Sequence, residues 1–523
     1  MLPAFGCVGK IEALRWQSQQ LIVILSALDS LIAIDLGTSH VKAAIFDLRG
    51  RRLARAARPC PLQRPKPAWC EQELSSLQEA AFACLAECIR TADLPLHAYR
   101  ALALTAQGDG TRLLRADGTP LRPAILWQDA RAVPILHRWR ADGRAALAAR
   151  YTGTALSASH QTAQLAWLVE HERQLLDETW RVFFAKDWLF FQLTGEAITD
   201  QSDASHTYLN FQTRQPEPRL LEILGLEALA EKLPPLRPPS ECIAPLRARQ
   251  AEILGLPAEL PVVLAPFDVV AELISVSGGV PNSACSVFGT AGVHQVSLAQ
   301  LKQRDDELIG GTTYIPSQAG YIRFIPTMLA TPNIEYWAQL LYPEAGEPHG
   351  AAGTPELEAE LAQVPIGAEG VSYLPFLAPS GERAPYLLPE AHAQFAGISL
   401  LHTRAHLLRA VYEGVALAAA HCYAFLPPFE PPLRLSGGGA RSPLLAQMMA
   451  DILYVDVVTY DSLSGALRGA AMYAATLLGA FTDLAAAFSA MQSPCQAFAP
   501  RPEAHAAYQP LAERYRDAVL ALG

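Results

Sequence analysis

The stretch Leu31-Ile-Ala-Ile-Asp35-Leu-Gly-Thr-Ser39 decides the fold of the first half of the chain. Its apolar run predicts a buried strand that ends at an acidic Gly-Thr turn, and residues 41–47 predict the next strand. The pattern returns as Ala284-Cys-Ser-Val-Phe288-Gly-Thr-Ala-Gly292, followed by a predicted strand over 293–298. Two such units, roughly 250 residues apart, indicate an internal duplication with a phosphate-facing turn in each half.

Strands and helices alternate outward from these two units. Helical spacing of apolar residues covers 71–90 and most of 131–193, and buried strands are predicted at 101–106, 262–265 and 433–436. This alternation predicts the α/β class. After the last of these strands, Gly437, Gly438 and Gly439 precede a predicted helix over 442–452, where a ligand can approach the backbone closely.

Size and charge limit the function. A chain of 523 residues, 51% of them hydrophobic, is long enough for two cores. Its net charge of −10 argues against nucleic acid and anionic membranes as partners. Nine cysteines without a CxxC pair fit a reducing compartment, and we expect the cytoplasm. The apolar run at 21–28 is too short to span a bilayer, so residues 1–28 are expected to be an N-terminal extension.

The residues at the turns suit phosphoryl transfer from ATP, which requires backbone amides around the phosphates, a carboxylate for Mg²⁺ and a base for the attacking hydroxyl. Asp35 is placed either to shape its turn or to hold hydrated magnesium, and Lys42 on the next strand can reach a phosphate. Asp268 lies between an apolar strand and a helix. It either caps that helix or acts as the base, and one carboxylate can do both.

Seven motifs occur in the order typical of the FGGY family of carbohydrate kinases, which the chain resembles from about residue 30 to 480. They are Asp35-Leu-Gly-Thr-Ser, Trp127-Gln-Asp129-Ala-Arg131, Phe267-Asp268, Gly289-Thr290-Ala-Gly, Gly381-Glu-Arg383-Ala-Pro, Glu413-Gly414 and Ser436-Gly-Gly-Gly-Ala440. The resemblance implies two actin-like, ribonuclease H-like ATPase domains with the active site in the cleft between them. It also implies ATP and Mg²⁺ as cofactors.

Carried over residue by residue, the resemblance implies the following roles. Asp268 is the catalytic base, and Asp35 and Asp268 surround the magnesium. The phosphates contact Thr38, Ser39, Lys42, Gly289 and Thr290, whereas adenosine contacts Gly437, Gly438, Gly439 and Gln447. The substrate hydroxyls are bound by Gln107, Asp109, Asp129 and Arg131. A surface salt bridge remains an alternative for Arg131, and simple packing remains one for Trp127.

The resemblance also divides the chain. We expect a sugar-binding N-terminal domain at 29–270, an ATP-binding C-terminal domain at 271–485 and a helical tail at 486–523. Several segments, among them Gln107-Gly-Asp109-Gly-Thr and Ala185-Lys186-Asp187-Trp-Leu, look most like erythritol kinases and their L-xylulose kinase relatives. One departure is Ser464-Gly-Ala-Leu-Arg468-Gly-Ala-Ala, where many relatives carry a Glu before an Ala-Leu-Gly-Ala-Ala helix.

The predicted reaction is phosphorylation of a small polyol or ketose at a hydroxyl group, with erythritol or a related tetritol or pentitol as the first choice. L-xylulose and D-xylulose are the alternative substrates. A catalytically silent actin-like protein that binds nucleotide or sugar is the alternative outside the enzymes, and the presence of Asp268 argues against it. The sequence leaves open whether the chain forms a homodimer.

Overall fold

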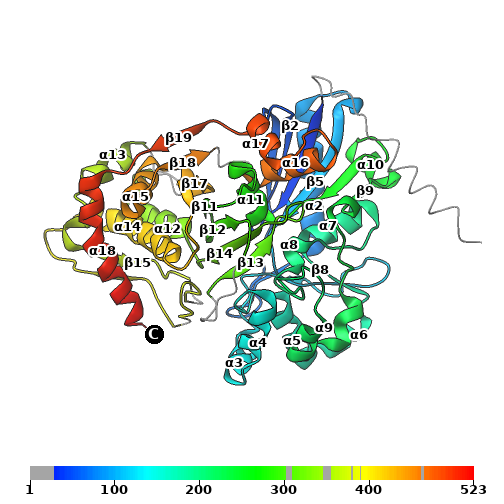
Figure 1. The fold of residues 1–523 in the computed structure, drawn as a ribbon, viewed down its shortest axis with the longest axis horizontal. Coiled ribbons are helices and arrows are strands. Elements are labelled where there is room, and N and C mark those ends of the chain that lie inside the picture. Colours follow the sequence, from blue (N-terminus) through cyan, green and yellow to red (C-terminus); the bar gives the residue numbers. More distant parts are fainter. Residues whose placement is uncertain are drawn as a thin grey trace, which may run out of the picture.

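The computed structural model describes residues 29–301, 309–345, 355–378, 381–388, 390–460 and 465–522. The N-terminal extension expected at 1–28 and Ser464 lie outside this range. Two mixed β-sheets form the two halves of the molecule, which lie side by side in Figure 1 with helix α11 between them. The α/β class predicted from the sequence is confirmed.

The first sheet has six strands in the order β3-β2-β1-β5-β10-β9. Strand β1 pairs antiparallel with β2 and parallel with β5, which in turn pairs parallel with β10. The carboxyl ends of β1, β5 and β10 therefore meet at one edge, and Asp35, Gln107 and Asp268 lie at or just beyond these ends. The bounds are β1 Ser30–Leu36, β2 His40–Asp47, β3 Arg52–Pro59, β5 Tyr99–Ala106, β9 Ile243–Pro245 and β10 Pro261–Leu264.

The second sheet repeats this plan in seven strands, in the order β13-β14-β12-β11-β17-β18-β19. Strand β11 pairs antiparallel with β12 and parallel with β17, as β1 does with β2 and β5. The sheet thus reproduces the duplication seen in the sequence. The bounds are β11 Ser283–Phe288, β12 Gly292–Leu298, β13 Gly311–Tyr314, β14 Tyr321–Pro326, β17 Glu430–Ser436, β18 Val457–Tyr460 and β19 Cys495–Phe498. Short strand pairs outside the two sheets are β4 Glu71–Gln72 with β7 Ala124–Ile125, β6 Arg112–Leu114 with β8 Arg181–Phe183, and β15 Ser372–Leu374 with β16 Gln394–Ala396.

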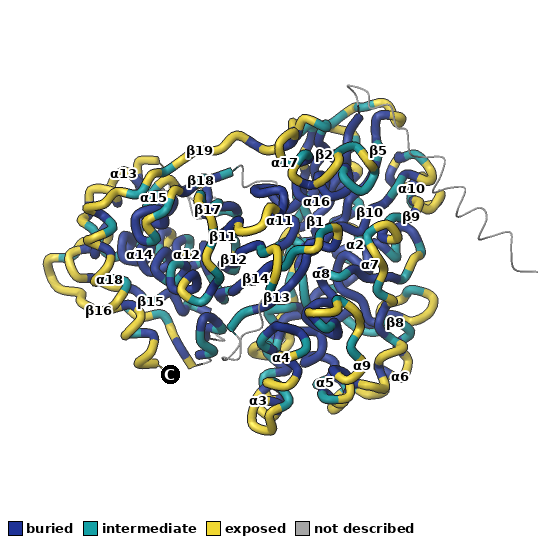
Figure 2. Tube along the Cα trace, in the orientation of Figure 1, coloured by how far each residue is buried: buried dark blue, intermediate teal, exposed yellow. Residues whose placement is uncertain are grey.

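Two helices, α11 (Asp268–Ser277) and α16 (Gly465–Leu477), pack against each other where the sheets meet. A Cβ atom at Gly469 would lie 1.8 Å from the carbonyl oxygen of Ala271, so a glycine is required where the two helices cross. Helix α16 follows β18 of the second sheet in the chain, yet it packs on β1 and β5 of the first. One apolar cluster therefore includes side chains from both halves, and Figure 2 shows this central region as mostly buried.

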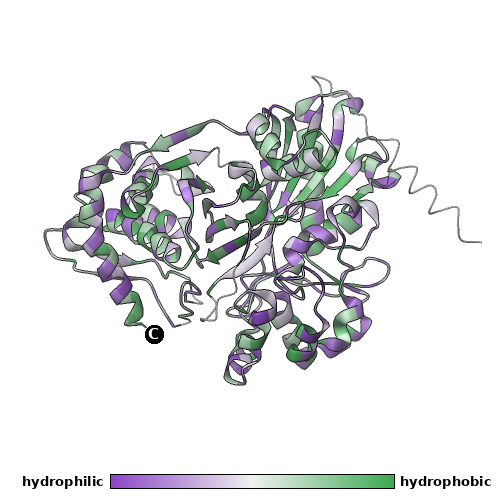
Figure 3. Cartoon of the chain, viewed as in Figure 1, coloured by the Kyte–Doolittle hydropathy of each residue, from purple (hydrophilic) through white to green (hydrophobic). Residues whose placement is uncertain are grey.

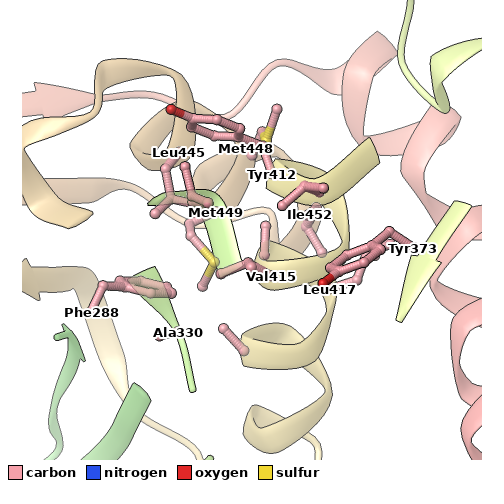
Figure 4. Packing of buried hydrophobic residues seen from close by; sticks show 14 of the residues in the cluster. Phe288, Ala330, Tyr373, Tyr412, Val415, Leu417, Leu445, Met448, Met449 and Ile452 are labelled. Carbon is pink, nitrogen blue, oxygen red and sulfur yellow. The ribbon is translucent and has the colours of Figure 1, made fainter. Parts of the chain in front are cut away.

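The remaining helices cover the outer faces. Helix α2 (Leu74–Ala92) packs on β2 and β3, whereas α12 (Thr331–Leu341), α14 (Arg404–Tyr423) and α15 (Pro443–Leu453) build the core beside the second sheet shown in Figure 4. A helical lobe with its own apolar cluster is added to the first half. The further helices are α3 Val133–Ala141, α4 Arg144–Thr152, α5 Gln161–His171, α6 Arg173–Glu178, α7 Ala185–Thr194, α8 Gln201–Ala204, α9 Pro218–Leu224, α10 Ala248–Leu254, α13 Pro355–Gln363, α17 Leu484–Met491 and α18 Pro502–Leu520.

Most of the segment expected to be a helical tail packs on the second half, whereas α17 at its start packs on α11 and α16. Strand β19 pairs with β18, and α18 packs on α14 and α15. Polar and apolar residues alternate along α18 in Figure 3, as is typical of a helix with one buried face. Within the described part of the chain, no helix is both long and apolar enough to cross a membrane.

Candidate active site

A cavity of about 360 Å³, here called the central cavity, lies between the two halves. Its wall in the first half comes from the carboxyl edge of the sheet, and its wall in the second half from the turn between β11 and β12 and the end of β17. The topology of the sheets explains where the two walls come from, because parallel strands end at one edge of a sheet and the duplication places two such edges opposite each other. The predicted site residues that line the cavity are Asp35, Thr38, Ser39, Lys42, Gln107, Asp109, Asp268, Gly289, Thr290, Gly437 and Gly438.

Among the described residues, Asp35 and Asp268 are two of the four carboxylates that line the cavity, with Asp109 and Glu272. Burial raises the pKa of Asp268 well above its ordinary value, and the negative charge of Asp35 raises it further. Burial also raises the pKa of Asp35, against the opposing effect of Lys42. The Oδ1 atom of Asp35 is buried without a hydrogen-bond partner among the described residues. Two facing carboxylates with an unsatisfied oxygen fit a hydrated divalent cation, which lowers the cost of their mutual repulsion.

Backbone geometry shapes the opposite wall of the cavity. Gly437 follows β17 with φ +79°, and a Cβ atom there would lie 2.6 Å from the carbonyl oxygen of Phe288. Only glycine fits this combination of conformation and contact. The turns at Gly37 and Gly289 line the same space, so two glycine turns and the glycine-rich end of β17 present backbone to the cavity.

The part of the cavity beside Gln107 and Asp109 is polar. The atoms Gln107 Nε2, Asp109 Oδ1 and His206 Nε2 are buried without hydrogen-bond partners in the described part of the chain. His160 stacks on His206 with ring centroids 5.8 Å apart, and burial lowers the pKa of each to about 4. Both imidazoles are therefore neutral at pH 7, and each can donate one hydrogen bond and accept another.

His160 and His206 are not among the site residues that the sequence predicts. Each is a lone histidine in a segment without a recognisable spacing, so no local signal marks it. They meet because α5 begins beside His160 and α8 ends beside His206, two positions 46 residues apart in the sequence. A pair of buried histidines of this kind can be found only from the packing.

Trp127 takes part in the cavity wall through a chain of hydrogen bonds. Its Nε1 donates to Thr38 Oγ1 at 2.9 Å, and Thr38 Oγ1 donates to Gln107 Oε1 at 2.8 Å. The guanidinium of Arg383, from the second half, lies 5.1 Å from the centroid of the Trp127 ring. Trp127 therefore does more than pack: it orients a residue of the first glycine turn and contacts the other half of the molecule.

Asp129 and Arg131, predicted to bind substrate hydroxyls, do not line the central cavity. Asp129 is 2% exposed and accepts hydrogen bonds from the backbone of Cys70 and from Arg131. Arg131 also binds Glu71 at 2.6 Å and lies over the Trp69 ring at 3.8 Å. The salt bridge allowed for Arg131 exists, but it is buried rather than on the surface. This cluster holds together the two loops that position Trp127.

Gly439 and Gln447 also lie outside the central cavity. Gly439 packs on Phe288, where a Cβ atom would come within 2.5 Å of the phenylalanine side chain. Gln447 lines a second cavity of about 940 Å³, between α13 and α15, where its Nε2 donates to Asp451 and to the Ala499 carbonyl.

Arg468, in the segment that departs from the sequence of many relatives, does not line the central cavity. Its guanidinium donates to the carbonyl oxygens of Gly50 and Met491 and lies 5.0 Å from the centroid of the Phe46 ring. Arg468 therefore ties α16 to the first sheet and to the end of α17, which is a structural role.

The fold and the cavity define a carbohydrate kinase, and the chain belongs to the FGGY family: residues 30–275 match the family's N-terminal domain and residues 284–478 its C-terminal domain. The two-domain, actin-like fold predicted for the chain is confirmed.

Among its relatives is an erythritol kinase of Brucella abortus, 32% identical over 94% of this chain and 96% of the relative. The chain is also similar to an L-xylulose/3-keto-L-gulonate kinase of Escherichia coli, at 27% identity over 94% and 97% of the two chains. The crystal structure of a xylulose kinase from Rhodospirillum rubrum matches with a TM-score of 0.81 at 28% identity, covering 94% of this chain and 99% of the other.

Proposed function

We propose that this kinase transfers the γ-phosphoryl group of ATP to a terminal hydroxyl of a small polyol, with erythritol or a related tetritol or pentitol as the substrate and Asp268 as the base. The observation that carries the proposal is the position of Asp268. It faces one cavity together with two glycine turns suited to phosphates and a polar end suited to hydroxyl groups.

Asp268 begins α11, and its Oδ1 accepts the backbone N–H of Val269 at 2.7 Å, which leaves the other carboxylate oxygen for a substrate hydroxyl. The raised pKa makes this carboxylate a stronger base than an exposed aspartate. As the hydroxyl attacks, Asp268 accepts its proton. Thr38, Ser39, Lys42, Gly289 and Thr290 hold the phosphate groups in line, and closure of the two halves excludes water as a competing acceptor.

Magnesium would be held by Asp35 and Asp268, and when bound it would neutralise charge on the phosphates. No group of three or more histidine, cysteine, aspartate or glutamate side chains suited to a metal occurs among the described residues. That agrees with Mg²⁺, which commonly takes one or two carboxylates and completes its shell with water and phosphate oxygens.

The polar end of the cavity supports a polyhydroxy substrate. Gln107, Asp109 and His206 each offer a buried polar atom without a partner, and a polyol supplies both donors and acceptors to satisfy them. Similarity to the Brucella abortus erythritol kinase favours a tetritol. Xylulose is the second candidate, because the Rhodospirillum rubrum xylulose kinase has the same fold over almost the whole chain.

Three further assignments belong to this proposal. Asp129 and Arg131 support the polar end of the central cavity indirectly, through the wall around Trp127. Adenosine extends from Gly437 and Gly438 toward Gln447 and the second cavity. The reaction takes place in the cytoplasm, where the free cysteines of the described chain, Cys60, Cys70, Cys84, Cys88, Cys242, Cys285, Cys422 and Cys495, remain reduced.

The test is ADP release with Mg·ATP across erythritol, other tetritols, pentitols, glycerol and ketopentoses, for the native protein and for Asp268→Asn. We expect saturable release with one tetritol or pentitol. The variant should bind nucleotide normally and turn over at least about 100-fold more slowly, because an amide cannot take the proton. Near-native turnover of a folded Asp268→Asn would remove Asp268 from the role of base. Nucleotide binding without stimulation by any compound would favour a silent nucleotide-binding protein.

A further inference from the structure

The segment Ala185-Lys186-Asp187 does not line the central cavity, yet it contributes to a buried cluster of charged side chains in the first half. Lys186 is fully buried on α7, and its Nζ lies 3.0 Å from Asp187, 2.8 Å from Asp200 and 3.1 Å from Asp203. Arg112, also fully buried, adds a second cation: burial lowers its pKa to about 10, and the charges of Asp203 and Asp187 oppose this shift.

Such a cluster is costly to bury. Three aspartates face two cations, and burial raises the pKa of Asp203 well above its ordinary value, against the opposing effect of Lys186. Apolar side chains of the same volume would fill this space at a lower cost in desolvation. The role of the cluster is therefore to be found in the part of the backbone that its hydrogen bonds hold in place.

The hydrogen bonds of the cluster extend to the residue that precedes α11. The Asp200 carboxylate, held by Lys186, accepts the hydroxyl of Ser202 at 2.9 Å. The Ser202 Oγ in turn accepts the backbone N–H of Phe267 at 3.2 Å. Phe267 is the N-cap residue of α11 and immediately precedes Asp268, and its own side chain makes no capping hydrogen bond.

A second contact connects the same serine to the other half of the molecule. The carbonyl oxygen of Ser202 accepts a hydrogen bond from Thr313 Oγ1 on β13 at 3.0 Å. Ser202 is completely buried, so neither contact is exchanged with solvent. Ser202 thus fixes the backbone beside Asp268 relative to both sheets.

We propose that Ser202, supported by Asp200 and Lys186, is a positioning residue for the reaction: it sets the direction in which α11 begins and thereby aims the Asp268 carboxylate at the substrate hydroxyl. This inference rests on the proposed role of Asp268 as the base. A base displaced by about an ångström can lose up to roughly 100-fold in rate, because proton transfer requires hydrogen-bond distance.

The experiment compares Ser202→Ala with Ser277→Ala in the full-length protein. Ser277 is a matched control at the other end of α11: it is buried, and its Oγ likewise accepts a backbone N–H, that of Gly279, at 3.2 Å. We expect Ser202→Ala to lower kcat by about 10- to 100-fold while KM for polyol and for ATP stays within about twofold. Ser277→Ala should lower the Tm by about as much as Ser202→Ala does and leave kcat within about twofold of the native value. Ser202→Thr, which keeps the hydroxyl, should recover most of kcat.

The idea fails if Ser202→Ala turns over at the native rate, if both alanine variants lose the same fraction of kcat, or if Ser202→Thr is as slow as Ser202→Ala. If Ser202→Ala does not fold, Ser202→Thr and Ser277→Ala still provide the comparison, and a kcat for Ser202→Thr that is about tenfold or more below that of Ser277→Ala overturns the proposal. Asp268→Asn is measured alongside. An active Asp268→Asn would refute the base itself, whereas an inactive Asp268→Asn beside a fully active Ser202→Ala refutes only the positioning.

Discussion

Replacing Glu272 by Gln should change the pH dependence of stability in a way that can be worked out from the structure. Glu272 lies one turn beyond Asp268 on α11 and lines the central cavity, where the hydroxyl of Ser436 donates to its Oε2 at 2.5 Å. Burial raises its pKa from 4.5 to about 7; Ser436 and Lys42 oppose the shift, and Asp35 adds to it. Glu272 is therefore protonated in the folded protein at a pH where the unfolded chain has already released its proton.

The sign follows from this difference. Between pH 4.5 and about 7 the folded state binds more protons than the unfolded state, so the free energy of unfolding falls as the pH rises through this window. Each pKa unit corresponds to about 1.4 kcal/mol, so the full effect is about 3 kcal/mol, and partial solvation of the cavity reduces it to between about 1 and 3 kcal/mol. Gln does not titrate and resembles the protonated acid.

Urea unfolding of the two proteins, without magnesium or nucleotide, should therefore give similar stabilities near about pH 5. The variant should be more stable by about 1–3 kcal/mol near about pH 8. His160 and His206, whose pKa values are lowered to about 4, contribute a slope of opposite sign. Their contribution cancels because both proteins contain them. A difference between the two proteins that stays constant with pH would refute the reasoning.

Three other substitutions test the remaining geometry. Gly437→Ala should lower the Tm and weaken nucleotide binding at least about tenfold, measured by calorimetry, because the new methyl group would displace the backbone against Phe288; unchanged binding would separate this glycine from the nucleotide site. Arg468→Met should cost about 2–4 kcal/mol in unfolding while kcat stays near native, because its two bonds to backbone carbonyls are remote from the cavity; a selective loss of ATP affinity would contradict this. Asp129→Ala should lower both the Tm and kcat, because it leaves Arg131 with fewer buried hydrogen-bond partners. A native Tm together with a higher KM for the sugar alone would instead indicate that Asp129 contacts the sugar directly.

The sequence by itself determined the class, the duplication and the two carboxylates, Asp35 and Asp268, at the cavity's acidic end. Alternation of apolar residues and glycine turns is a local signal, and it located β1, β5, β10, β11 and β17 within a few residues. Asp35 and Asp268 follow from the same signal because each ends or follows a predicted strand. That these two residues would meet was implied by the resemblance to the family, and the parallel pairing of β1, β5 and β10, which brings the strand ends to one edge, explains why they do.

The tertiary structure alone decided which other side chains face the cavity. His160 and His206 carry no local pattern and become neighbours only through tertiary packing, in which α8 contacts β13 of the second sheet. Asp129 and Arg131 have the residue types of a sugar site, yet Glu71 and Cys70 satisfy them inside the protein. Helix α16 crosses from the second half onto the first sheet, and Ser202 reaches the backbone of Phe267 across 65 residues. Periodicity and spacing describe a segment and its near neighbours, whereas contacts of this kind depend on how buried surfaces from distant segments fit together.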